Sequence, residues 1–144
     1  MIKHSNSTDT LAYADGLQIR YEVFVEEEHV PENIELDEYE SVSENFTFYV
    51  SSVPAAVLRL RGLDEEGVVK VERMAVLKKF RRLGFGKTLL TQALKWAKHV
   101  AGYKKAVMNA QVSAVPFYTS LGFVAFGDEF DEAGIAHVKM EKVL

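Results

Sequence analysis

The sequence has 144 residues, of which 48% are hydrophobic, enough for the core of one domain of ordinary size. Its 17 Lys and Arg against 21 Asp and Glu give a formal net charge of −4. The absence of Cys excludes disulfides, a thiolate zinc site and a cysteine nucleophile. No apolar run approaches the ~20 residues of a membrane span, and the opening MIKHSNSTDT has no apolar segment typical of a secretion signal. We therefore expect a single cytoplasmic domain over residues 1–144, with no membrane partner.

The small net charge hides a separation of charges along the chain. Residues 21–58 contain ten acids and no Lys or Arg, whereas residues 70–105 contain eleven Lys or Arg and one acid, Glu72. We call residues 22–44 the acidic arm, and we expect it either to attract a cationic ligand or only to keep the protein soluble. The acidic overall balance, with few aromatic residues among the basic ones, argues against nucleic acid as a partner.

The first half of the chain predicts a helix, an acidic connection and three strands. Residues 7–9 are good N-cap residues, and Pro31 ends the helix that follows them. Its expected apolar stripe is Leu11, Ala14, Leu17 or Gln18, Tyr21, and Phe24 or Val25. The acidic stretch through Glu44 predicts a short helix or a loop. Residues 46–51, 55–63 and 68–76 are rich in β-branched and aromatic residues, which predicts an antiparallel meander.

The second half predicts an alternation of helices and strands after a basic loop at residues 78–86. A stripe at helical spacing, Leu90, Ala93, Leu94, Ala97 and Val100, precedes Gly102 at a C′ position. A strand over 106–110, a short helix over 113–121 and a hairpin of 123–130 with 135–142 follow. The full order, β-α-α-β-β-β-α-β-α-β-β, indicates an α/β (α+β) fold: a mixed, mostly antiparallel twisted sheet of about seven strands with helices on both faces.

The connection between the strand at 68–76 and the next helix reads Arg81-x-x-Gly84-x-Gly86. Glycines let successive backbone N–H groups converge on an anion, and a helix N-terminus adds partial positive charge. A P-loop would need glycine where the chain has Arg81, and a dinucleotide fingerprint would need glycine where it has Leu89. The loop therefore predicts a phosphate or pyrophosphate site of another type.

The pattern resembles the R/Q-x-x-G-x-G/A signature of the GNAT N-acetyltransferase superfamily, whose loop holds the pyrophosphate of acetyl-coenzyme A. A second segment, Ala114-x-x-Phe117-Tyr118-x-x-Leu121-Gly122-Phe123, resembles the family's fourth helix and the strand after it. The opening Arg20-x-x-Val23-Phe24-Val25-x-Glu27-x-x-Val30-Pro31 is similar to that of the small ElaA/YjcF-like subgroup. The chain departs from this subgroup at Glu28, where glutamine is usual, and from the wider superfamily at Gln111, where asparagine is usual.

The resemblance implies a GNAT-like fold and an enzyme that uses acetyl-CoA as co-substrate and needs no metal. It implies direct attack on the thioester by a primary amine, either a small cationic amine or a lysine-like acceptor, without an acyl-enzyme. The implied cofactor-binding residues are Met74 and Val76, through backbone groups, with Arg81, Arg82, Gly84, Phe85, Gly86, Lys87, Gln111 and Phe117. The implied substrate-binding residues are Arg20, Glu27 and Glu28.

The chemistry also needs a base and an acid, because a lysine-like amine with a pKa near ~10.4 is charged at neutral pH. The candidate bases are Glu72, Glu27 and His137. Cations around Glu72 should lower its pKa, so it serves either as a weak base or as an ion-pair partner. Periodicity favours a surface position for His137 over a catalytic one. Tyr118 is the candidate acid for the departing thiolate; the alternative is an aromatic residue that only packs.

Two further questions stay open at the level of sequence. A non-catalytic acyl-CoA-binding or regulatory module would keep the glycine loop and lack a productive acceptor site. The closing hairpin at residues 123–142 is also a candidate surface for a homodimer.

Overall fold

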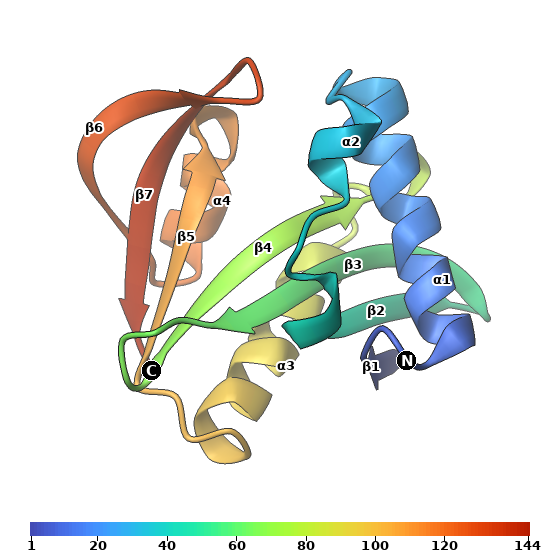
Figure 1. Ribbon diagram of the computed structural model, residues 1–144, viewed down its shortest axis with the longest axis horizontal. Helices are drawn as coiled ribbons and strands as arrows, with labels where there is room; N and C mark the ends of the chain where they lie inside the picture. The colour runs from blue at the N-terminus through green and yellow to red at the C-terminus, as the bar shows by residue number, and fades with distance from the viewer.

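The computed structural model describes the backbone of residues 1–144 and every side chain except that of Thr10. Over these residues, seven strands form one sheet in the order β1-β2-β3-β4-β5-β7-β6 (Figure 1). The strands are β1 (Ile2–Ser5), β2 (Glu44–Val50), β3 (Val53–Gly62), β4 (Val68–Val76), β5 (Lys105–Gln111), β6 (Val124–Glu132) and β7 (Ile135–Val143). Within the described chain, β4 and β5 are the one parallel pair of neighbours, so the predicted mostly antiparallel sheet is confirmed.

The helices are α1 (Thr10–Arg20), α2 (Glu32–Glu35), α3 (Phe85–His99) and α4 (Val115–Ser120). A π-helical segment, η1 (Tyr21–Glu27), continues α1, and short 3-10 turns follow at η2 (Glu40–Val42), η3 (Lys78–Phe80) and η4 (Val112–Ala114). The order of strands and main helices is the one that the sequence predicts. In the described part of the chain, no helix is long and apolar enough to cross a membrane.

Helices cover both faces of the sheet and give it two cores. Leu58 and Leu60 of β3 pack in the larger core together with Leu90, Ala93, Leu94 and Ala97 of α3. Val100, expected in the same stripe, follows the end of α3 and is 72% exposed. Val57, which points to the opposite face, packs against Ile19 and Val23 on α1 and η1. Figure 1 shows α1 and α2 in front of the sheet and α3 behind it. Because both faces are covered, every residue from 55 to 60 is buried, and the strand forms an almost continuous apolar run.

The first helix buries a different face from the expected one. The buried positions are Ala12, Gly16, Ile19, Arg20 and Val23, whereas Leu11 is 77% exposed and Tyr21 is also exposed. Gly16 allows close approach to β3, since a Cβ built on it would lie 3.0 Å from Val57 Cγ2. A glycine and a charged arginine therefore occupy core-facing positions, and the apolar periodicity alone pointed to the wrong face.

The sheet opens between β4 and β5. The two strands pair over Val68–Lys70 and Lys105–Val107 and then diverge, as Figure 1 shows. Beyond this point β5 stays paired with β7 along its whole length. The divergence accompanies a bulge in β4, where the register with β3 shifts and Arg73 takes a φ of 53°. The free edges of β4 and β5 thus face each other inside the sheet.

Candidate active site

A cavity of about 510 Å³ lies where β4 and β5 separate. Residues of η1 and α2 line one side, and the turn that joins β6 to β7 lines the other. The polar side chains along its wall are Glu28, Glu35, Asp37, Tyr39, Arg61, Lys70, Glu72, Arg73, Asn109, Gln111, Tyr118, Glu132 and His137. Of the four expected acid and base candidates, Tyr118, Glu72 and His137 line this cavity, and Glu27 does not.

Glu28 and Tyr118 lie close enough for the charge of one to affect the other. Gln111 Nε2 donates a hydrogen bond to Glu28 Oε1 over 2.8 Å. Burial, and to a smaller extent the charge of Glu27, raises the pKa of the Glu28 carboxyl. Burial also raises the pKa of Tyr118 to about 12, and the negative charge of Glu28 adds to this effect. The cavity therefore pairs a carboxylate of increased basicity with a phenol that keeps its proton.

Glu28 was expected to contact substrate and was not among the expected bases. One signal for its place was the departure from the subgroup, which usually has glutamine there. A glutamine could accept the same type of hydrogen bond but could not take up a proton. The structure therefore places at position 28 a group that can act as a base, a role that the spacing of the sequence motif alone did not indicate.

Glu72 lines the cavity as a member of an ion-pair cluster. Arg61 Nε lies 2.7 Å from its carboxylate, and Arg59 Nη2 lies 3.3 Å away. Burial alone would raise the pKa of Glu72, but the hydrogen bond from Arg61 and the charge of Arg59 lower it overall. Of the two expected roles, the structure favours the ion-pair partner, because a carboxylate with a lowered pKa is a weak base.

His137 is buried, with 7% exposure, so the expected surface position is wrong. Its ring stacks on Phe130 of β6 with 6.0 Å between the ring centroids. Nδ1 donates to the carbonyl oxygen of Ile135 over 2.7 Å, and Nε2 lies 3.5 Å from a carboxylate oxygen of Glu132. The alternation along β7 did not reveal this burial, because it depends on Phe130 of the neighbouring strand, which stacks on the ring.

Glu27 and Arg81 join η1 to the glycine loop. Two guanidinium nitrogens of Arg81 donate to the two carboxylate oxygens of Glu27 over 2.7 and 2.6 Å. Arg81 Nε donates to the carbonyl oxygen of Val76 over 2.8 Å. The hydrogen bond from Arg81 lowers the pKa of Glu27, which makes Glu27 a weak base. Arg81 in this arrangement fixes the loop against η1 with all three of its nitrogens.

The glycines of the loop lead into α3, whose N-terminus has no side-chain cap among the described residues. Gly84 adopts a left-handed conformation with a φ of 81° directly before α3, and no side-chain hydrogen bond caps the helix among the described residues. A Cβ on Gly86 would lie 3.3 Å from both Met74 Cε and Val76 Cγ2. The first N–H groups of α3 are therefore available to an anion, and the lack of side chains keeps their approach open.

The remaining expected cofactor residues divide into charged and packing groups. Lys87 is exposed in the first turn of α3, and Arg82, in the loop before it, is exposed too. Phe85 stacks on Phe48 with ring centroids 5.0 Å apart. Phe117 packs against the larger core next to Gly86. The structure thus brings the loop residues together around the start of α3.

Arg20 does not reach the cavity, although the sequence resemblance implied a substrate contact. It is 1% exposed, and its Nε donates to Glu35 Oε1 over 2.6 Å. Its two terminal nitrogens donate to the carboxylate of Glu40 over 2.9 and 3.0 Å. All three guanidinium nitrogens are therefore engaged inside the protein.

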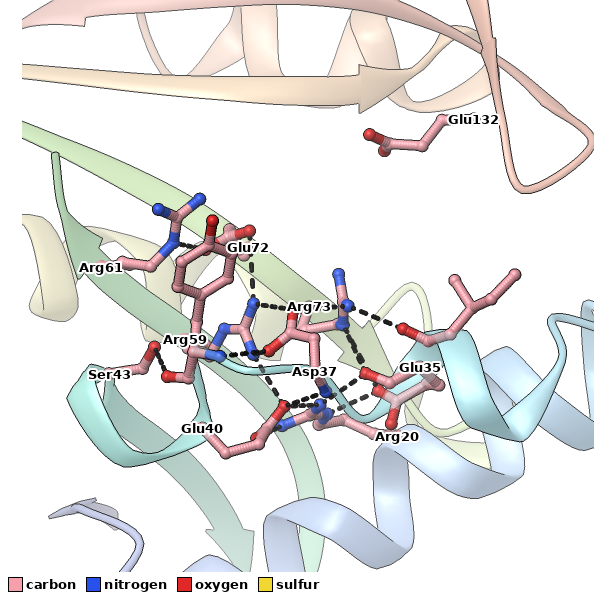
Figure 2. A network of polar contacts seen from close by, with 12 residues as sticks. Arg20, Glu35, Asp37, Glu40, Ser43, Arg59, Arg61, Glu72, Arg73 and Glu132 are labelled. Atoms are coloured by element: carbon pink, nitrogen blue, oxygen red, sulfur yellow. Dashed lines mark hydrogen bonds and ion pairs between the residues drawn. The ribbon is translucent and has the colours of Figure 1, made fainter.

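Arg20 belongs to a network of buried ion pairs beneath the cavity (Figure 2). Arg59, with 0% exposure, pairs with Asp37 and Glu40 over 2.9 Å each. Arg73 pairs with Asp37 over 3.1 Å. Arginines from other segments therefore neutralise part of the acidic arm, namely Glu27, Glu35, Asp37 and Glu40. Apart from Glu27, the exposed carboxylates of the arm are Glu22, Glu26, Glu32 and Glu38, so it does not form the uniform negative surface that the sequence suggested.

No group of three or more His, Cys, Asp or Glu side chains within the described residues is arranged to hold a metal ion.

The model of the Acetyltransferase (GNAT) domain family matches residues 9–144. The uncharacterized N-acetyltransferase YjcF of Bacillus subtilis is 40% identical over 129 residues, which cover 89% of this chain and 90% of that protein. A crystal structure of a proposed N-acetyltransferase from Lactobacillus plantarum superposes with a TM-score of 0.90 at 28% identity, covering 99% of this chain and 98% of the other. An acyl-CoA N-acyltransferase from Pseudomonas aeruginosa gives a TM-score of 0.85, also at 28% identity, with 99% of both chains covered.

The chain therefore belongs to the GNAT acetyltransferase family, and it is an acetyl-CoA-dependent acyltransferase. The resemblance of its glycine loop and of its fourth helix to this family is confirmed. The similarity to YjcF supports the narrower resemblance as well.

Proposed function

We propose that the protein transfers an acetyl group from acetyl-CoA to a primary amine by direct attack in the cavity between β4 and β5. The observation that carries this proposal is the meeting of Glu28, Gln111 and Tyr118 at the cavity wall. A base and an acid of suitable protonation states are the two groups that amine acetylation needs. The absence of Cys from the chain agrees with a route that has no acyl-cysteine intermediate.

The donor occupies the glycine loop and the free edge of β4 in this proposal. The N–H groups at the start of α3 hold the pyrophosphate, and Arg82 and Lys87 add positive charge. The diverging edge of β4 offers backbone groups of Met74 and Val76 to the amides of the pantetheine arm. The closely packed Gly86 supports this assignment, because a side chain there would press on both β4 residues.

Separate side chains then carry out the two proton transfers. Glu28 takes a proton from the incoming ammonium, directly or through water, and the neutral nitrogen attacks the thioester carbonyl carbon. The C–N bond forms, the C–S bond breaks, the thiolate takes the phenolic proton of Tyr118, and the acylated nitrogen gives its remaining excess proton to the Tyr118 phenolate. Loss of a proton to solvent returns Glu28 to its starting state. His137, buried against Glu132, is the second candidate for the base.

The first test is thiol release from acetyl-CoA in the presence of a broad set of primary amines, namely peptides, polyamines, aminosugars and amino acids. We expect at least one amine class to accelerate release, with formation of an N-acetyl product detected by mass spectrometry. Calorimetric binding of CoA without product from any amine would instead support the non-catalytic acyl-CoA-binding module.

We also propose that residues 1–144 act as one domain. The support is that β1 and β7, from opposite ends of the sequence, belong to the same sheet. Limited proteolysis of the folded protein should leave one resistant core that contains both strands; separate resistant fragments would contradict this proposal.

A further inference from the structure

The β4 side of the cavity carries more positive charge than its carboxylates neutralise. The ion-pair network contains five cations and four carboxylates among the described residues: Arg20, Arg59, Arg61, Lys70 and Arg73 against Glu35, Asp37, Glu40 and Glu72. Arg20 and Arg59 are buried and occupy most of the carboxylate oxygens. The remaining carboxylate oxygens are shared by the cations at the cavity wall, which are Arg61, Lys70 and Arg73.

These three cations keep unused hydrogen-bond donors. Arg61 uses its Nε on Glu72, and its guanidinium lies 3.8 Å from the centroid of the Tyr39 ring. Arg73 uses Nε and Nη2 on the segment that contains Glu35 and Asp37. Within the described residues, the terminal nitrogens of Arg61 and Nη1 of Arg73 make no hydrogen bond, and Figure 2 shows them projecting from the network toward the side where Glu132 lies.

Lys70 is even less engaged than the two arginines. Its Nζ lies 3.9 Å from the nearest carboxylate oxygen of Glu72, which is beyond hydrogen-bond distance. It lies on β4 at the last residue that pairs with β5, so it marks the end of the cavity where the strands are still joined. A ligand group at this end would meet an ammonium and two guanidinium groups.

The β5 side of the cavity, where Gln111 and Asn109 hold Glu28 and Glu132, has the reverse charge. Glu28 accepts its hydrogen bond from a neutral amide, that of Gln111. Glu132 accepts a hydrogen bond from Asn109 over 3.2 Å and remains half exposed. A ligand with positive charge alone would face Arg61, Lys70 and Arg73, and one with negative charge alone would face Glu28 and Glu132. The complementary ligand has both charges.

The geometry points to an acceptor that carries an anionic group in addition to its amine, with the anionic group bound by Arg61, Lys70 and Arg73 while the amine faces Glu28. A carboxylate fits best, because guanidinium donors match its two oxygens. A phosphate could accept hydrogen bonds from the same donors, and the phosphoethanolamine arm of the kinetic test distinguishes it from a carboxylate. The transfer step of this inference rests on the proposed function, whereas the binding of the anionic group does not.

Kinetics with paired acceptors tests this preference. The pairs are glycine, β-alanine, γ-aminobutyrate and lysine, each against its own amide, with phosphoethanolamine against ethanolamine as the phosphate arm. We expect kcat/KM to be about tenfold higher for at least one charged member than for its neutral partner, the effect of one charge-assisted hydrogen bond. Equal values within every pair would overturn the inference.

Variants then assign the preference to the β4 side. Lys70→Gln and Arg61→Gln should each remove most of the preference for the charged acceptor, and thermal unfolding verifies that each variant is folded. The matched control is Lys95→Gln, on an exposed position of α3, which removes the same charge outside the cavity. A preference that survives both cavity variants, or that falls equally in the control, would contradict the assignment.

Calorimetry separates failure of this inference from failure of the proposed function. Protein saturated with CoA is titrated with each acid and its amide, which needs no turnover. Tighter binding of the acid without any acetylated product would support the anion site and overturn the acetyl transfer. Acetylation that proceeds with equal affinity for acid and amide would support the transfer and overturn the anion site.

Discussion

In the proposed reaction, Glu28 takes a proton and Tyr118 gives one, and their environments suit these opposite tasks. Burial raises the pKa of both groups. For a carboxyl, a raised pKa increases basicity; for a phenol, it keeps the proton available. The same physical cause thus prepares an acceptor and a donor in one cavity.

Glu28→Gln should remove the acid limb of the pH profile. Glu28 acts as a base only when deprotonated, so kcat/KM should fall as the pH drops through a raised pKa, above the usual ~4.3 for glutamate. The variant should lose about 10²-fold or more in kcat/KM at neutral pH. Initial rates across the pH range, with the exposed Glu26→Gln as control, check this. An acid limb that persists in Glu28→Gln would point to His137 instead.

Tyr118→Phe should lower kcat by about 10²-fold and leave the KM for acetyl-CoA nearly unchanged. The phenyl ring keeps the packing against Phe117 and Phe123, while the proton donor is lost. Because the pKa of Tyr118 is about 12, no decline of the rate from its ionisation should occur below about pH 11. Steady-state kinetics provide the measurement, and Tyr21→Phe on the exposed face of η1 provides the control. An unchanged kcat would assign Tyr118 to packing alone.

The start of α3 depends on a glycine that leads the chain into the helix. Gly84→Ala puts a Cβ on a residue with a φ of 81°, which costs about 1–2 kcal/mol, although nothing lies within 4 Å of that Cβ. The strain should move the N–H groups that face the pyrophosphate. We expect weaker CoA binding by calorimetry together with a modest loss of stability.

Gly102→Ala is the matched control for this change. Gly102 has a φ of 78° and equally open surroundings, but it follows the opposite end of α3. It should lose similar stability and keep the CoA affinity of the wild type. Equal CoA affinities for the two variants would show that strain at Gly84 does not reach the anion site.

The elements were predictable where one physical signal dominated their sequence. The limits of β4, 68–76, agree with the prediction because turn residues precede the β-branched run and a basic loop follows it. The buried face of α1 was not predictable from apolar periodicity, since Gly16 and Arg20 occupy it. Gly16 lets α1 approach β3 closely, and Arg20 forms buried ion pairs. Neither residue contributes to the apolar periodicity of the sequence. The glycine loop was recognisable because its motif is local.

The cavity was less predictable because it depends on contacts between distant segments. Glu28 meets Gln111 across 83 positions of sequence, and Arg20 meets Glu35 and Glu40 only after the acidic arm folds over β3 and β4. Charge counts along the chain suggested an acidic half and a basic half. In three dimensions, arginines from the rest of the chain lie among the acids, so the separation is lost in the network.

The ion-pair network should make the stability of the molecule depend on acid pH. Arginine hydrogen bonds and charges hold the pKa of Asp37 at about 2 and lower that of Glu40, against the opposing effect of burial. For groups with a lowered folded pKa, stability is complete above the unfolded value near ~4 and is lost as the pH falls toward the folded value. Urea unfolding should therefore show a decline between about pH 4.5 and 2.

Glu40→Gln tests the same network at one position. Glu40 pairs with both Arg20 and Arg59, so its loss leaves two buried cations short of a partner and should cost about 3–5 kcal/mol. The dependence of stability on acid pH should become shallower. Glu26→Gln, exposed in the same acidic arm, should stay within about 0.5 kcal/mol of the wild type. Equal losses for both variants would contradict a specific role for the network.

The divergence of β4 and β5 also has a consequence for the exchange of amide hydrogens with solvent. Three residue pairs join these strands, and beyond Lys70 and Val107 their facing edges are separate. Amides on these edges lack a ladder partner even though they lie in the middle of the sheet. In deuterated water without ligand, they should exchange earlier than amides of the same strands that face β3 or β7. A line of fast exchange should therefore run through the centre of the sheet.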